Sequence, residues 1–104
     1  MTDKRGMERV GDLMPETARR LGLEEELRRA RAVGTWSAIV GERLAAAAGS
    51  CRLVRIEGPL LVVEADDPTV GQELRLRSHE LARAFSAAPG GAPVTGLRVT
   101  VRRV

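Results

Sequence analysis

The chain has 104 residues, with 17 Lys and Arg against 14 Asp and Glu, which gives a net charge of +3 and a pI near 10.4. A single histidine and a single cysteine are too few for the metal centres and catalytic triads of common hydrolases, and no phosphate-binding loop or dinucleotide fingerprint is present. We therefore expect no enzymatic activity, no metal and no cofactor. The lone cysteine and the lack of a long apolar run predict a cytoplasmic protein without a membrane partner.

The N-terminal half predicts two helices. Residues 1–6 are polar and are expected to be disordered, and residues 7–104 are expected to form a single domain. Pro15 is expected to kink the first helix or to begin it anew, and Gly22 is expected to end this helix. The first helix carries an apolar series, Val10, Leu13, Met14 and Leu21.

A second helix is expected to open at the glutamates 24–26, where the positive end of the helix dipole favours carboxylates. Its apolar residues recur every three or four positions and predict one packed face. The alanine run 45–48 and Gly49 provide its end. The members of this apolar face are Leu27, Ala30, Val33, Trp36, Val40, Leu44 and Ala47.

The second half predicts a hairpin, a helix and a last strand. Residues 52–56 and 60–65 are β-prone and are joined by a tight turn. Asp67 is a candidate cap for a helix that carries Val70, Leu74, Leu81 and Phe85 on one side and ends at 89–91. Residues 97–102 alternate apolar and polar side chains, and a right-handed crossover would place this strand parallel to its neighbour. The expected fold class is α+β, in the order α-α-β-β-α-β, with the helices on one face of a small mixed three-stranded sheet.

The basic residues of the C-terminal end form one candidate binding surface. No acidic residue follows Glu80, and the last strand is expected to expose Arg98 and Arg102 on the face away from the helices. Arg52 and Arg55 of the hairpin could join them, and guanidinium groups bind phosphates or carboxylates. An equally weighted alternative is a solvated strand face whose charges discourage edge aggregation.

Three other residues, Trp36, Gly41 and His79, have a functional and a structural interpretation, and Cys51 has a structural one. Trp36 suits an interface, but its place in the apolar series favours the core. Gly41 suits a binding surface, although close helix packing is the simpler account. His79 is interpreted as a solvated or partly packed helix residue and not as an acid–base group, and Cys51 as a small buried residue that begins a strand.

The order of these segments resembles the DciA-type family of bacterial replicative-helicase loaders, over about residues 7–104. In that family a helix carrying Trp and then Val-Gly precedes a hairpin, and the next helix opens with an aromatic residue followed by Ala-Gln-Glu-Leu. This sequence differs at the latter motif, because Val70 and Gly71 stand where Trp and Ala are common. The residues that match are Trp36, Val40, Gly41, Gln72, Glu73 and Leu74.

The resemblance implies a KH-like domain of the type II pseudo-KH kind. It also implies a noncatalytic adaptor in DNA replication that binds a DnaB-type helicase and assists its loading on DNA, with single-stranded DNA as a further candidate partner. The Gly-x-x-Gly turn of nucleic-acid-binding KH domains is absent, so any nucleic acid is expected to contact arginines. The expected contacts are Arg52, Arg55, Arg98, Arg102 and Arg103. A KH-like RNA-binding or ribosome-associated protein is the alternative, and a structural or oligomerisation module is a third hypothesis.

Overall fold

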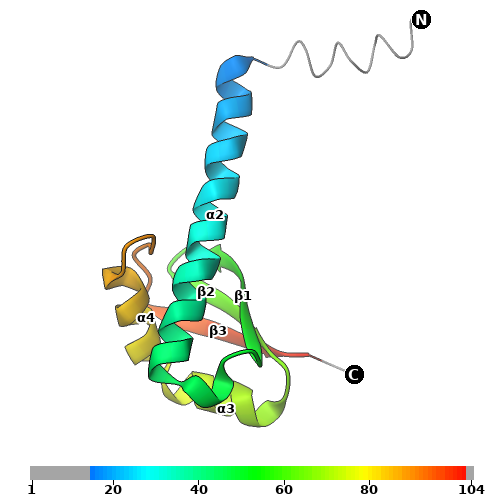
Figure 1. Cartoon of the computed structure of the whole chain (residues 1–104). Helices are drawn as coiled ribbons and strands as arrows, with labels where there is room; N and C mark the ends of the chain where they lie inside the picture. Colours follow the sequence, from blue (N-terminus) through cyan, green and yellow to red (C-terminus); the bar gives the residue numbers. More distant parts are fainter. Residues whose placement is uncertain (1–14, 103–104) are drawn as a thin grey trace, which may run out of the picture.

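A computed structural model describes residues 15–102 of the chain. Its elements follow the order α-β-β-α-α-β, with one turn of 3₁₀ helix after the first helix (Figure 1). They are α2 (Glu16–Arg43), η1 (Ala45–Ala47), β1 (Cys51–Glu57), β2 (Leu60–Ala65), α3 (Pro68–Leu76), α4 (Ser78–Ala87) and β3 (Gly96–Val101).

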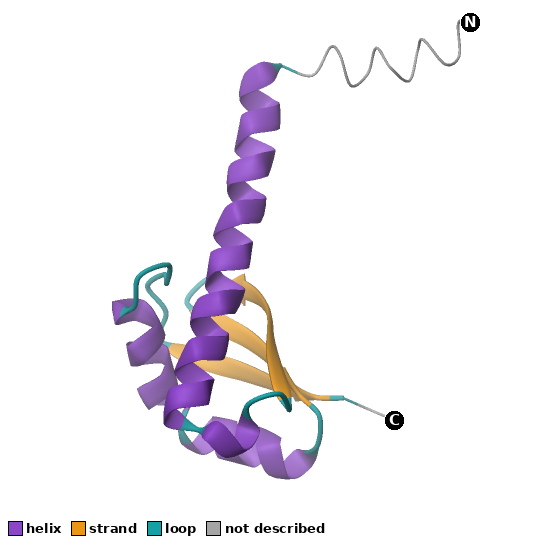
Figure 2. Ribbon diagram, viewed as in Figure 1, coloured by secondary structure: helices purple, strands orange, loops and turns teal. Residues whose placement is uncertain are grey.

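The three strands form one mixed sheet in the order β1-β2-β3. The β1 and β2 strands are antiparallel, and β3 lies parallel to β2, as the crossover argument predicted. The helices cover one face of this sheet and leave the other face open (Figure 2). The predicted α+β class, with helices on one face of a three-stranded mixed sheet, is therefore confirmed.

A tight turn and a bulge shape the hairpin. Gly58 has a φ of 57°, a left-handed backbone conformation that residues other than glycine rarely adopt. This conformation allows β1 to turn directly into β2. The register of β1 shifts between Leu53 and Arg55, so that Val54 is an extra residue against β2. Edge strand β1 is thus irregular in its middle.

The expectation of two helices separated at Gly22 is wrong for the described residues, because α2 runs without interruption through Gly22 for 28 residues. A glycine inside a helix costs only about 1 kcal/mol, which the surrounding helix-forming residues can offset. Because α2 is so long, its N-terminal half extends beyond the sheet (Figure 1). Leu27 and Val33, which were expected in the core, are consequently 57% and 41% exposed. The expected start of the first helix lies outside the described residues.

The single helix expected after the hairpin is in fact two helices, α3 and α4, which meet at Arg77. The start of α3 is as expected, since Pro68 is its first residue and the Asp67 carboxylate accepts a hydrogen bond from the Val70 N–H at 2.9 Å. At the start of α4 the Ser78 hydroxyl accepts a hydrogen bond from the backbone N–H of Leu97 at 2.9 Å. The break therefore brings the second helix into direct contact with β3, an attachment that apolar periodicity alone does not reveal.

The core lies between the helices and the covered face of the sheet. The alternation of β3 is as predicted, with Leu97, Val99 and Val101 less exposed than Arg98 and Thr100. Only two aromatic side chains contribute, so aliphatic residues fill most of the volume. The largest fully buried side chains are Trp36, Phe85, Leu61, Leu74, Leu81, Val40 and Val63.

Helix α3 also lies close against β3. Gly71 is buried, and a Cβ atom placed on it would lie 3.0 Å from Cγ2 of Val101. One turn later, the Arg75 guanidinium donates a hydrogen bond to the backbone carbonyl of Val99 at 3.3 Å. These contacts tie the helix to the last strand.

Candidate binding surface on the open face of the sheet

The open face of the sheet brings together the four described arginines that the sequence indicated. Arg52 of β1 lies beside Glu64 of the central strand β2, and Arg55 and Arg98 lie on either side of Val62. Arg102 follows the end of β3. Arg103, the fifth candidate, lies outside the described residues.

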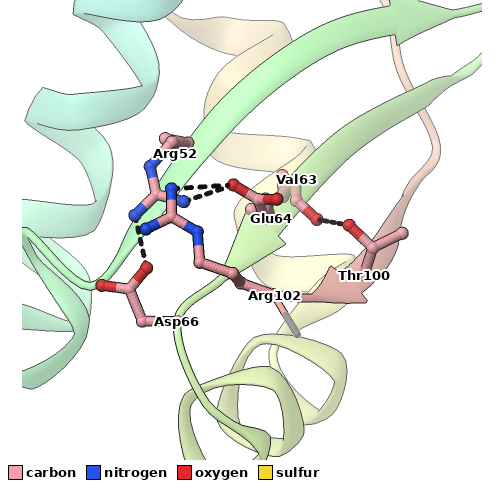
Figure 3. A network of polar contacts seen from close by, with 6 residues as sticks. All are labelled: Arg52, Val63, Glu64, Asp66, Thr100 and Arg102. Carbon is pink, nitrogen blue, oxygen red and sulfur yellow. Dashed lines mark hydrogen bonds and ion pairs between the residues drawn. The ribbon is translucent and has the colours of Figure 1, made fainter. Parts of the chain in front are cut away.

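One ion-pair cluster lies at the end of the hairpin farthest from its turn (Figure 3). The Arg52 guanidinium contacts two carboxylates, with Nη1 2.5 Å from Oε1 of Glu64 and Nη2 2.5 Å from Oδ1 of Asp66. Arg102 approaches the same Glu64 oxygen at 3.5 Å. Because two arginines share Glu64, this cluster links β1, β2 and the end of β3.

A second cluster lies near the hairpin turn. Glu57, the last residue of β1, accepts a hydrogen bond from Nε of Arg55 at 2.7 Å and another from Nη1 of Arg98 at 2.8 Å. The Arg98 side chain is 56% exposed and the Arg55 side chain 49% exposed. Both guanidinium groups are therefore accessible to a partner despite their shared carboxylate.

The ion pairs shift the pKa values of their members. A hydrogen bond from Arg52 lowers the pKa of Asp66, and a hydrogen bond from Arg55 lowers the pKa of Glu57. The pKa of Arg52 is raised by its hydrogen bonds to Asp66 and Glu64. These shifts favour the charged forms of Asp66, Glu57 and Arg52.

The net charge of this surface is small. Four arginines face three carboxylates, Glu57, Glu64 and Asp66, which leaves an excess of one positive charge among the described residues. These carboxylates were not among the residues expected at this surface from the sequence. A signal was present, since Glu64 lies in a β-prone segment and Asp66 follows it two positions later, but matching them to Arg52 requires the hairpin register.

The matched motif residues divide into buried and exposed groups. Trp36, Val40 and Leu74 are at most 2% exposed and are core residues. Gln72 is exposed, and Glu73 forms an ion pair with Arg77 at 3.6 Å. The motif around Leu74 therefore supplies one core residue and two surface polar groups.

Gly41 does not serve close helix packing, contrary to the simpler interpretation. It is exposed on α2, and a Cβ atom placed on it would meet nothing within 4 Å. The residues that pack on the body lie on the other side of the helix. The described fold therefore gives no packing reason for a glycine at this position.

Trp36 lies near Cys51 at the start of β1. Its indole Nε1 is buried and has no hydrogen-bond partner in the described part of the chain. Burial raises the pKa of the half-buried Cys51 thiol, and the neighbouring Trp36 partly offsets this effect. A neutral thiol in this place is a packing residue, as the sequence predicted, although it is only partly buried.

Residues 15–102 contain no cluster of three or more His, Cys, Asp or Glu side chains arranged to hold a metal ion. Within the same residues, no helix has the length and apolar character that crossing a membrane requires. The chemistry available on the open face is therefore ionic recognition by arginine and carboxylate groups.

Comparison with known proteins places this architecture in a family. A family model described as "Dna[CI] antecedent, DciA" matches residues 9–99, which include both helical motifs, the hairpin and most of β3. The chain belongs to the DciA family. A "UPF0232 protein" of Mycolicibacterium paratuberculosis (strain ATCC BAA-968 / K-10) is 29% identical to this DciA-family chain over 98 residues. The match covers 94% of the chain and 52% of the relative, so the chain spans about half the length of that relative.

Proposed function

We propose that this DciA-family protein is a noncatalytic adaptor in bacterial DNA replication. It binds the cytoplasmic DnaB-type replicative helicase and assists the loading of that helicase on DNA. The family match over residues 9–99 is the observation that carries this proposal. The order of strands and helices in residues 15–102 supports it, because it agrees with the KH-like domain that the resemblance implied.

The open face of the sheet is the proposed contact for an anionic partner, with single-stranded DNA as the first candidate. Its arginines are held at fixed positions by the strands, and Arg98 and Arg102 are more than half exposed. Exposed ion pairs contribute only about 0–1 kcal/mol each, so phosphate groups can compete with Glu57 and Glu64 for the same guanidinium groups. The small excess charge should make this contact modest in affinity and strongly dependent on salt.

The helicase interaction is tested by size-exclusion chromatography with light scattering. The protein is mixed with the replicative helicase of its own organism, with and without a single-stranded oligonucleotide. A complex whose mass equals that of the helicase plus bound adaptor supports the proposal. If the folded protein elutes alone under both conditions, the helicase-loading proposal is wrong; tight binding to an RNA oligonucleotide in the same experiment would then favour the RNA-binding alternative.

The nucleic-acid contact is tested separately with a double charge reversal, Arg98→Glu with Arg102→Glu. Fluorescence anisotropy with labelled single-stranded DNA at low salt should show affinity weaker by at least about tenfold, because phosphate contacts provide most non-specific binding energy. A matched control, Arg20→Glu with Arg83→Glu, makes the same change in net charge on exposed residues of α2 and α4 away from the open face and should have a much smaller effect. Equal losses in the two variants would show that net charge, and not this surface, determines binding.

A further inference from the structure

The N-terminal half of α2 presents an apolar stripe that nothing in residues 15–102 covers. Leu23 is 62% exposed and Leu27 is 57% exposed, and Ala30 continues the stripe one turn later. These positions follow the alternating four- and three-residue spacing of the a and d positions of a heptad. Ala32, which packs on the body and is 6% exposed, lies on the opposite side of the helix. The stripe therefore faces away from the domain.

Charged residues flank this stripe in an ordered pattern. With Leu27 at position a, the flanking g positions hold Arg19 and Glu26, and the flanking e positions hold Glu24 and Arg31. Within residues 15–102, Glu24, Glu26 and Arg31 form no ion pair and no side-chain hydrogen bond. Their neighbours Glu25 and Arg28 form an ion pair with each other at 3.0 Å. Arg19 has only a distant partner, Glu16 at 3.9 Å.

We propose that α2 associates in parallel with α2 of a second copy of this chain through this stripe. In a parallel pair, each g position lies beside the e position of the next heptad of the partner helix. Arg19 then faces Glu24 of the second copy, and Glu26 faces Arg31 of the second copy. Both contacts are attractive, and the two-fold symmetry of the pair produces each of them twice.

The same charges disfavour an antiparallel pair. In that arrangement e positions face e positions, and g positions face g positions. Glu24 would meet Arg31 in one register, whereas Arg19 would meet Glu26 only in a different register. Aligning Leu23 with Leu27 would bring Glu24 of one copy near Glu24 of the other, which is repulsive. Only the parallel register combines leucine contacts with attraction at every e and g position, and this outweighs the single like-charge contact of Arg20 with Arg20 of the second copy at the preceding a position.

The surface farther along α2 allows the two domains to lie side by side. The stripe continues through Gly34, Ser37 and Gly41, which are small and exposed. A Cβ atom on either glycine would meet nothing within 4 Å in the part of the chain that the structure describes, which therefore gives no packing reason for their presence. Small residues let two helices approach closely, and the bodies of the two copies would lie on the outer sides of the pair.

The contact offers two leucine layers and one alanine layer before the glycines, which is shorter than a stable coiled coil. Association should therefore be reversible and should depend on protein concentration. This inference does not depend on the proposed DNA contact, which lies on the open face of the sheet, and the helicase interaction does not require a pair of copies, so its failure would leave the proposed function in place.

The experiment is a charge exchange measured by analytical ultracentrifugation at low salt, with the full chain. One variant carries Glu24→Arg with Glu26→Arg, and the other carries Arg19→Glu with Arg31→Glu. Each variant alone places like charges at every flanking contact, and its self-association should weaken by at least about tenfold. An equimolar mixture of the two variants restores opposite charges and should recover a dimer, which a loss of folding could not do.

A matched control is Arg28→Glu with Arg29→Glu, two residues on the other side of α2. It makes the same charge change as the second variant and should leave association at the level of the unaltered chain. Orientation is tested with Ala30→Cys in a Cys51→Ser background, because a parallel pair brings the two introduced thiols together and permits oxidative cross-linking. An unaltered chain that stays monomeric up to its solubility limit would overturn the inference. A mixture of the charge variants that stays monomeric, or a dimer without the cross-link, would do the same.

Discussion

Replacing Trp36 by alanine is the sharpest test of how the core is organised. The side chain is 1% exposed and is the largest one buried in the described residues. Truncating a buried aromatic side chain to alanine typically costs about 3–5 kcal/mol, since it removes apolar contacts and leaves a cavity. A domain of this size has a free energy of unfolding of about 5–15 kcal/mol, so the variant should retain only a small margin of stability.

Thermal and urea unfolding, followed by circular dichroism, measure this effect. The melting temperature should fall by roughly 12–40 °C, because each kcal/mol corresponds to about 4–8 °C in a domain near this size. Trp36→Phe is the matched control. Within residues 15–102 the indole N–H has no hydrogen-bond partner, so this substitution mainly reduces volume and should cost only about 1–2 kcal/mol.

Two outcomes separate the core from the interface interpretation of Trp36. A destabilised alanine variant with a milder phenylalanine variant supports the core assignment. An alanine variant that melts like the unaltered chain and yet loses helicase binding would refute the reasoning, because a side chain with almost no exposed surface cannot be both dispensable for folding and in direct contact with a partner.

Three further predictions concern local contacts. Asp67→Ala removes the carboxylate that caps α3 and should lower the free energy of unfolding by about 1 kcal/mol in urea titrations. Asp67→Asn should retain most of the stability that the cap provides. An alanine variant as stable as the unaltered chain would contradict the capping role. Gly71→Val places branched atoms against Val101 and should cost about 1–3 kcal/mol, whereas an unchanged melting temperature would show that α3 can move away from β3 at little cost. The pKa values of Asp66 and Glu57 are lowered in the folded state, so the two carboxylates stabilise the fold at pH values above their ordinary pKa values of 3.8 and 4.5. This stabilisation is lost as the pH falls below those values, so the melting temperature should decrease over that range. The decrease should be smaller at high salt.

The sequence predicted the elements whose signals are local. The cap at Asp67, the turn at Gly58 and the alternation of β3 each depend on a few adjacent residues, and the structure contains all three. The fold class followed from their order. These features could be recognised because backbone conformation and side-chain period are determined within a few residues.

The errors arose where distant contacts decide the outcome. Apolar periodicity on α2 continues through Leu27 and Val33, but periodicity does not reveal where the sheet beneath a helix ends. The helix break at Arg77 depends on Ser78 reaching β3, which is remote in sequence. On the candidate surface, the arginines were recognised from strand alternation, whereas their carboxylate partners required the register of the sheet.

The two outer strands of the sheet differ from a regular, open edge. Val54 forms a bulge in β1, and the Arg75 guanidinium donates a hydrogen bond to the backbone carbonyl of Val99 on β3. Irregular or covered edges cannot easily add a strand from another molecule. The protein should therefore resist intermolecular sheet growth when it is concentrated, and loss of the Arg75 side chain should make it more prone to form fibrils than its small effect on folding would suggest.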